Sequence, residues 1–191
     1  MSFLDKLQNQ KNKLKGTETV VTTVDGQRYV EKGSEVTAIC PNTYGFVVDT
    51  NPDNIPVLVT DCLYIGSQDC TANSVIEEYN IKYVVSLGII VDVSVSSKFV
   101  NCLDLPETNI KDMLSECLPF IRSAIESSEN VLVHCNAGVS RTSTVAIAYL
   151  MHYERMAFQE AYDLVKSKRP AIRPNDGFRK QLQALTPGEV I

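Results

Sequence analysis

The sequence has 191 residues but no tryptophan and only two histidines. It also lacks an apolar run as long as the roughly 18 residues that a membrane-spanning helix requires. The scarcity of histidine and the absence of Cys-x-x-Cys pairs argue against a zinc site. The 18 Lys and Arg residues do not balance the 23 Asp and Glu residues, and an acidic chain is a poor candidate for general binding to nucleic acids or acidic membranes. We therefore expect a globular protein that works without metal or cofactor.

The six cysteines do not have the composition or the setting of a disulfide framework. We expect free thiols, because the thiol chemistry inferred below needs a reducing compartment. The expected location is therefore the cytoplasm, with the nucleus as an alternative. Four thiols are expected to be buried or half-buried: Cys62, Cys70, Cys102 and Cys117. Whether one of them can form a disulfide with an oxidised Cys135 stays open at this point.

The first 56 residues differ in character from the rest and are expected to form an N-terminal extension. Residues 3–15 carry a modest helical pattern. The two strand patterns on either side of Asp25-Gly26, Thr19–Val24 and Gln27–Glu31, predict a β-hairpin with a type I′ turn. Residues 49–56, which contain two prolines and two asparagines, are typical of a connecting loop.

Residues 57–186 are expected to form the main domain, followed by a short tail at 187–191. Strand patterns alternate with helix patterns here, which predicts an α/β domain with a mixed, mainly parallel central sheet flanked by helices. Strands are predicted at 57–65, 82–87, 98–103 and 131–134, and helices at 71–79, 110–127, 141–153, 158–168 and 175–185. The helix at 141–153 is apolar on nearly all sides and is expected to lie in the centre.

The most informative stretch is His-Cys-Asn-Ala-Gly-Val-Ser-Arg-Thr, residues 134–142. The apolar run Val131–Val133 before it and the helical pattern after it indicate a strand-to-helix turn. Main-chain N–H groups of such a loop lie near the positive end of the helix dipole and form an anion site. Arg141 can hold two oxygens of a phosphate or sulfate at once. The residues expected to bind the anion with Arg141 are Asn136, Ala137, Gly138, Val139 and Ser140.

The same loop is expected to make Cys135 a nucleophile. A thiol beside an arginine at a helix N-terminus ionises more readily than a free thiol, and the thiolate could attack phosphorus in line to give a phosphocysteine intermediate. The Thr142 hydroxyl could donate a hydrogen bond to the thiolate and ease its departure. His134 is expected to order the loop backbone rather than act as a base. The alternative is a structural cysteine and an unrelated arginine.

A general acid is needed to protonate the leaving oxygen. One candidate is Asp104, which follows the strand pattern Lys98–Leu103 and opens a proline-containing loop that could swing over the anion site; the family resemblance given next is the main reason to prefer it. Asp92, Glu107 and Asp112 compete with it on chemistry alone.

These motifs resemble the cysteine-dependent protein tyrosine phosphatase superfamily, in particular its small atypical dual specificity phosphatases. The family signature His-Cys-x5-Arg-Ser/Thr is matched at residues 134–142, and Asp104 has the spacing of the family's acid aspartate. Three further segments resemble the family: Leu63–Ser67, Lys82–Leu87 and Arg169–Phe178. In the last of these segments, the resemblance implies that Asn175 contacts the anion-binding loop between His134 and Thr142.

The resemblance implies a protein tyrosine phosphatase-like fold and hydrolysis of phosphotyrosine, phosphoserine and phosphothreonine in proteins, in stress-activated MAP kinase signalling. The uncharged residues between Cys135 and Arg141 argue against an inositide substrate, and the absence of tryptophan argues against a glucan. The alternatives are the same chemistry on glucan, lipid or RNA phosphate, and a phosphate-binding kinase scaffold. The expected partners are a phosphorylated protein and a kinase or scaffold docked through the N-terminal extension, with no nucleic acid and no membrane.

Overall fold

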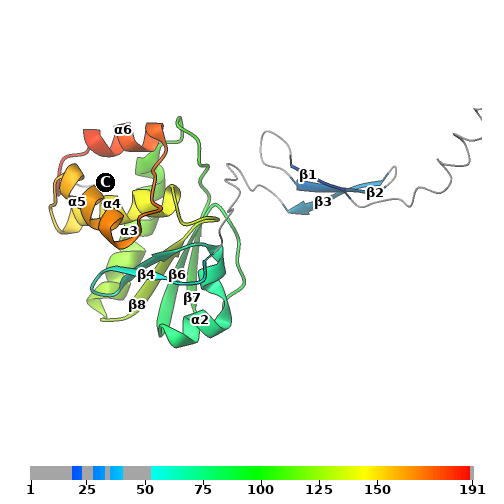
Figure 1. The fold of residues 1–191 in the computed structure, drawn as a ribbon, viewed down its shortest axis with the longest axis horizontal. Helices are drawn as coiled ribbons and strands as arrows, with labels where there is room; N and C mark the ends of the chain where they lie inside the picture. The colour runs from blue at the N-terminus through cyan, green and yellow to red at the C-terminus, as the bar shows by residue number, and fades with distance from the viewer. Residues whose placement is uncertain (1–18, 23–27, 33–34, 41–52, 190–191) are drawn as a thin grey trace, which may run out of the picture. The chain divides into compact units, whose positions relative to one another are not determined.

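The protein is described here by a computed structural model (Figure 1), in which residues 19–22, 28–32, 35–40 and 53–189 are placed. The chain divides into two compact units between Thr43 and Tyr44. The helix predicted at 3–15 lies outside the described residues, and so do the Asp25-Gly26 turn and the first half of the loop at 49–56.

The first unit contains a three-stranded antiparallel sheet in the order β1-β2-β3. Its strands are β1 (Thr19–Thr22), β2 (Arg28–Lys32) and β3 (Glu35–Cys40). The pairing of Thr19 with Glu31 and of Thr22 with Arg28 confirms the predicted hairpin. We did not predict β3, because its residues Glu-Val-Thr-Ala-Ile-Cys do not alternate regularly between polar and apolar.

The second unit is an α/β domain built on a five-stranded sheet in the order β4-β5-β8-β6-β7. The strands are β4 (Val57–Thr60), β5 (Leu63–Gly66), β6 (Ile81–Leu87), β7 (Ser96–Val100) and β8 (Asn130–His134). Four of them run parallel, and only the edge strand β4 is antiparallel to its neighbour. The prediction of a mixed, mainly parallel sheet is therefore confirmed.

Two of the predicted strands have wrong boundaries. The segment 57–65 forms two strands rather than one, because the chain reverses at Asp61, whose φ of 36° lies in the left-handed region. The strand predicted at 98–103 ends at Val100 and begins earlier, at Ser96. Strand β7 is an edge strand, and it can include exposed serines because solvent borders its unpaired side. The residues after Val100 leave the sheet.

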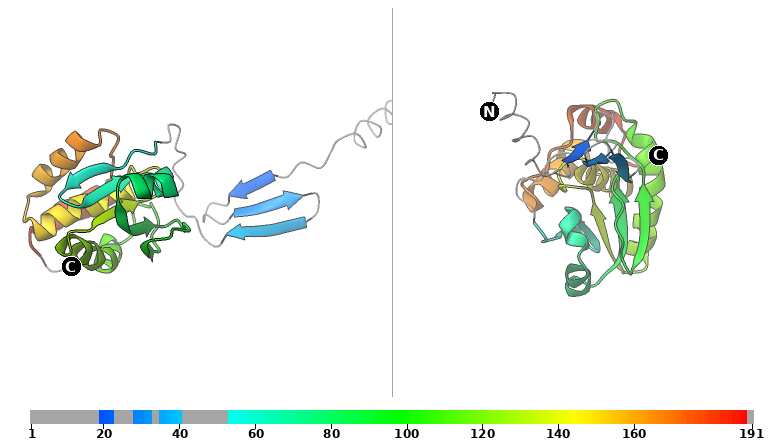
Figure 2. Two further views of the ribbon diagram at one scale, coloured as in Figure 1. Left: turned by 90° about the horizontal axis from the view of Figure 1, so that it is seen from below. Right: turned by 90° about the vertical axis from the view of Figure 1, so that its right-hand side faces the viewer.

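Helices cover both faces of this sheet. They are η1 (Gln68–Thr71), α2 (Asn73–Glu78), α3 (Ile110–Glu126), α4 (Arg141–Tyr153), α5 (Phe158–Lys168) and α6 (Asp176–Ala184). Alternate strand residues point to opposite faces: Val131 and Val133 join the larger core with α3–α6, whereas Leu132 joins the smaller core beside α2. Figure 2 shows the strands between α2 and α3. Burial on both faces explains why β8 is apolar from Val131 to Val133.

Helix α4 lies at the centre of the larger core, as predicted. Its residues from Arg141 to Met151 are all buried, so its N-terminus is held in a fixed position behind the sheet edge. Despite its apolar character, neither α4 nor any other helix in the described part of the chain is long and apolar enough to cross a membrane.

The carboxyl ends of β5, β8 and β6 meet at one edge of the sheet, where Gly66 and Ser86 both lie beside His134. Ligand sites of parallel sheets form at this edge. His134 is fully buried, with Nε2 2.7 Å from Ser86 Oγ and Nδ1 3.4 Å from the Cys135 carbonyl oxygen. Since a carbonyl only accepts hydrogen bonds, Nδ1 carries the proton and Nε2 accepts from the hydroxyl. This arrangement agrees with a role in ordering the backbone.

The buried histidine makes the stability of the domain sensitive to acid. Burial lowers the pKa of His134 to about 4 from an ordinary value of 6.5, although the Cys135 carbonyl opposes this shift. Between these two values the unfolded chain binds the proton that the folded chain excludes, so stability falls as the pH decreases from 6.5 to 4, by up to about 3 kcal/mol.

Denaturant unfolding followed by circular dichroism across this pH range measures the effect. His134→Asn keeps a polar, uncharged group and removes the titration, so its free energy of unfolding should depend less on pH than that of the native protein. Parallel curves for the two proteins would contradict the prediction, since the carboxylate contributions are common to both.

Candidate active site

The loop between β8 and α4 forms the candidate site, at the strand-to-helix turn that the sequence predicts. We call residues 135–141 the phosphate loop. Strand β8 ends at His134 and α4 begins at Arg141, so Cys135 is the first residue after the strand. The Cys135 side chain is 2% exposed, which places the thiol at the base of the loop rather than on the surface.

All five carbonyl oxygens from residue 136 to residue 140 accept hydrogen bonds from groups that surround the phosphate loop. The Asn136 oxygen accepts from the Gln68 N–H at 2.9 Å, and the Val139 oxygen accepts from the Arg173 N–H at 2.9 Å. The Ser140 oxygen accepts from the main chain and the side chain of Thr144 within the first turn of α4.

Arg169, a buried residue that follows α5, binds the two carbonyls in the middle of the loop. Its Nε donates to the Gly138 oxygen at 3.1 Å, and its Nη2 donates to the Ala137 oxygen at 3.4 Å. Because the N–H and C=O of a trans peptide point in opposite directions, carbonyls that face outward leave the loop's N–H groups facing its concave side. The phosphate loop therefore has the main-chain geometry of an anion site.

Gly138 is required by the path of the loop. Its φ is +66°, and a Cβ atom at this position would lie 2.5 Å from the Gly66 carbonyl oxygen and 2.8 Å from the Ser67 nitrogen. Both the left-handed conformation and the close approach to the end of β5 exclude a larger side chain.

Arg141 is buried at the end of the phosphate loop and is oriented by main-chain groups. Its Nη1 donates to the Leu87 oxygen at 2.9 Å and lies 3.5 Å from the Cys102 oxygen. Gly88 makes room for this guanidinium, because a Cβ there would lie 2.3 Å from Nη1. The fork of Arg141 is thus fixed before any ligand arrives.

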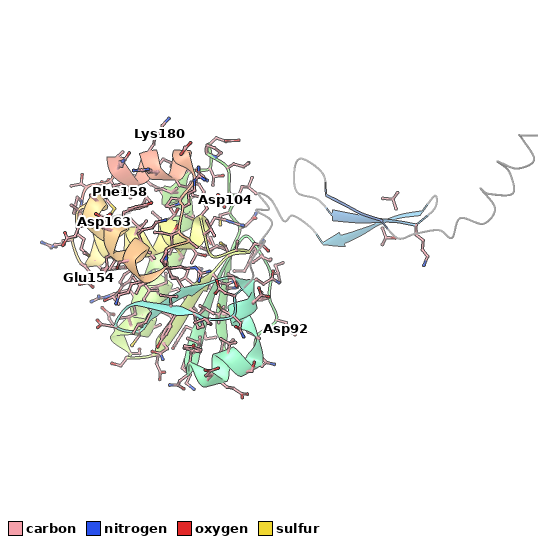
Figure 3. The ribbon with its side chains drawn as sticks, in the orientation of Figure 1. Asp92, Asp104, Glu154, Phe158, Asp163 and Lys180 are labelled. Carbon is pink, nitrogen blue, oxygen red and sulfur yellow. The ribbon has the colours of Figure 1, made fainter. Side chains whose placement is uncertain are left out.

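Asp104 lies beside Arg141 and the phosphate loop. Its Oδ1 accepts from Ser140 Oγ at 2.7 Å, and its Oδ2 is 3.6 Å from Arg141 Nε. Asp92, Glu107 and Asp112 are exposed, and Figure 3 shows Asp92 in a different part of the domain from Asp104. Geometry therefore favours Asp104 among the four.

Asn175 contacts the phosphate loop, as the family resemblance implied. Its main-chain N–H donates to Ser140 Oγ at 3.1 Å, and its side-chain amide donates to Asp104 Oδ1 at 2.8 Å. The Thr142 hydroxyl is buried and has no hydrogen-bond partner among the described residues. It is close to Cys135 in sequence, but the hydrogen bond proposed to the sulfur is absent from this geometry.

Two residues of this site were missed by the sequence reasoning. The sequence indicates Arg169 only as part of a segment that resembles the family, and it places Asp53 in a predicted connecting loop. The two form a bidentate pair, with Arg169 Nη1 and Nη2 at 3.2 and 2.8 Å from the Asp53 oxygens. They are 116 residues apart, so no local pattern could have linked them.

The site contains thiol, guanidinium and carboxylate groups but no arrangement suited to a metal. No cluster of three His, Cys, Asp or Glu side chains that could hold an ion occurs in the part of the chain that the structure describes. The five cysteines with described side chains are free thiols, and Cys70, Cys102 and Cys117 are buried while Cys62 is half-buried, as predicted.

Known proteins share both the sequence and the fold of this domain. Residues 63–186 match the model of the dual specificity phosphatase catalytic domain. A probable dual specificity protein phosphatase of Dictyostelium discoideum is 35% identical over 96% of each chain. Dual specificity protein phosphatase 19 of Mus musculus is 34% identical over 90% of this chain and 83% of its own length.

The solved structures agree with the sequence comparisons. Human DUSP28 superposes with a TM-score of 0.63 at 25% identity, over 74% of this chain and 95% of that chain. The protein tyrosine phosphatase-like fold expected from the resemblance is thereby confirmed. Together, the matched catalytic domain and the relatives that span almost the whole chain show that this protein belongs to the dual specificity protein phosphatase family.

Proposed function

We propose that this protein hydrolyses phosphotyrosine, phosphoserine and phosphothreonine in proteins through a phosphocysteine intermediate on Cys135. The observation that carries the proposal is the outward binding of the five phosphate-loop carbonyls, which leaves the N–H groups of the same peptides on the concave side of a loop that begins at a buried thiol. A phosphoryl group fits this cradle because its oxygens accept hydrogen bonds from several N–H groups at once.

In the first step, the Cys135 thiolate forms a bond to phosphorus while the bond to the leaving oxygen breaks. Arg141 and the loop N–H groups hold the three equatorial oxygens, and Asp104 gives its proton to the leaving oxygen. In the second step, water attacks phosphorus, Asp104 takes a proton from that water, and the Cys135 sulfur leaves. The Thr142 hydroxyl, which is buried without a described partner, is free to donate to the departing thiolate.

Protein substrates are supported by the side chains of the phosphate loop. Asn136 and Val139 are half-buried, while Ala137, Gly138 and Ser140 are buried. None of the five carries a charge, so the loop itself offers no cation for the additional phosphates of an inositide. The family resemblance supports two further parts of this proposal. The substrates belong to stress-activated MAP kinase signalling, and a kinase or scaffold docks through the N-terminal extension. A site of action in the cytoplasm or nucleus is supported by the described thiols, all of which are free.

A substrate panel tests the proposal. We expect release of phosphate from phosphotyrosine and phosphothreonine peptides, including the activation-loop peptide of a stress-activated MAP kinase, and little release from phosphoinositide, glucan or RNA. Cys135→Ser should abolish turnover yet retain binding of vanadate or phosphopeptide, because the loop N–H groups and Arg141 remain. Faster turnover of lipid, glucan or RNA phosphate would show that proteins are not the substrate class. Residual activity of Cys135→Ser would show that another residue is the nucleophile.

Arg141→Lys tests the need for a fork rather than a charge. A lysine keeps the positive charge but cannot bind two oxygens in one plane, so kcat/KM should fall on the order of 10²-fold or more. The control is Arg155→Lys, at an exposed position, for which no change is expected. A loss of less than tenfold in the Arg141 variant would show that charge alone is sufficient.

The two members of the Arg169–Asp53 pair should differ in their effect on stability. Arg169→Met leaves two buried carbonyls without donors, which should lower the free energy of unfolding by about 2–3 kcal/mol. The Asp53 side chain is 38% exposed, so Asp53→Asn should lower it by less than about 1 kcal/mol. Denaturant unfolding and kcat/KM of both variants measure this, and equal losses would place the main contribution in the ion pair instead.

A further inference from the structure

We propose that the start of α6 and Ser140 act together as a positioning device for the acid loop, residues 104–109, and that Asp104 delivers its proton from Oδ2. This inference rests on the proposed function, in which Asp104 is the general acid. It assigns the atom that carries the proton and the residues that hold it there. Ser140, Asn175 and Gln181 are in this sense positioning residues, since none of them exchanges a proton with the substrate.

The two carboxylate oxygens of Asp104 have different surroundings. Oδ1 accepts two hydrogen bonds, from Ser140 Oγ at 2.7 Å and from Asn175 Nδ2 at 2.8 Å. Two donors occupy both lone pairs of this oxygen, so a proton placed on it would face them. Oδ2 instead lies 3.6 Å from Arg141 Nε, on the side of the residue that holds the phosphoryl group. A protonated Asp104 therefore carries its hydrogen on Oδ2.

The orientation of the Asn175 amide is itself determined by α6. Its Oδ1 caps the helix by accepting from the Phe178 N–H at 2.9 Å. Because the oxygen is used in this way, the NH2 group must point in the other direction, toward Asp104. Phe178 is fully buried in the larger core, so the packing of α6 fixes the donor that orients the acid.

Ser140 completes this arrangement from the phosphate loop. Its hydroxyl has one hydrogen, which it donates to Asp104 Oδ1, and its oxygen accepts the main-chain N–H of Asn175 at 3.1 Å. Three hydrogen bonds therefore join Asp104, the phosphate loop and the start of α6. They are made by the Ser140 hydroxyl and by the main-chain and side-chain N–H groups of Asn175. A displacement of any of the three parts changes where Oδ2 points.

The rest of the acid loop is bound to α6 as well. Gln181 donates to the Thr108 oxygen at 2.8 Å and accepts from the Ile110 N–H at 3.0 Å. Gly177 lets the main chain of Pro106 lie against the helix, where a Cβ would be 1.9 Å from the Pro106 oxygen. The sequence predicts a loop that could swing over the anion site, and these contacts bind it to α6 beside that site.

A leaving-group series tests the inference. Aryl phosphates with leaving groups of increasing pKa depend increasingly on protonation of the departing oxygen. Asn175→Ser keeps a helix cap but loses the donor to Asp104, and Gln181→Ala releases the acid loop at a point farther along α6. Both variants should lose more rate with phenyl phosphate than with p-nitrophenyl phosphate, by a ratio of about tenfold. Gln183→Ala, at an exposed position of the same helix, is the matched control.

A double-mutant cycle separates positioning from simple stability. In the Asp104→Ala background, Asn175→Ser should cause no further leaving-group-dependent loss, because the group it positions is gone. Equal losses with all leaving groups, or losses that multiply fully with Asp104→Ala, would overturn the inference. Ser140→Ala gives the same readout if the Asn175 variant proves unstable. A flat leaving-group dependence of Asp104→Ala itself would instead overturn the assignment of the acid in the proposed function.

Discussion

Five main-chain carbonyls that face away from the centre of the phosphate loop determine what this site can bind. Each of them is bound by a group outside the loop or in the first turn of α4, and the opposite edge of each peptide is thereby directed inward. The positive potential in front of Cys135 comes from N–H dipoles, the end of α4 and a single guanidinium. The fold holds all of these groups in place, so the cradle is preorganised for an anion.

The fixed position of this cradle follows from the layered fold. Helix α4 is buried along most of its length and β8 is the central strand, so the two elements that carry the loop are the least free to move. The candidate acid Asp104 lies on a different segment, between β7 and α3. Helix α6 joins the two sides, because its N-cap residue Asn175 donates hydrogen bonds to both Ser140 and Asp104.

The sequence predicted those features whose cause is local. The proposed nucleophile, the arginine and the turn between them lie within nine residues, and the helices and most strands have clear periodicity. Partners that are distant along the chain escaped prediction: Gln181 meets Thr108 across 73 residues, and Arg169 meets Asp53 across 116. Strand β3 was missed for a different reason, because its polar and apolar residues do not alternate. The fold class and the main candidate residues could be predicted, and the family resemblance also indicated Asn175, but the distant partners Asp53 and Gln181 could not be predicted.

The Asp53 carboxylate has a consequence for where this domain can be cut. Its side chain pairs with Arg169, and its main-chain oxygen accepts from Ser67 Oγ at 2.6 Å. The matched catalytic domain begins only at residue 63. A fragment that starts at residue 63 would lose both Asp53 and strand β4. The Arg169 guanidinium would then be paired with water instead of a carboxylate, and β5 would become an unpaired edge strand. A fragment that keeps these contacts and β4 therefore has to start upstream of Asp53.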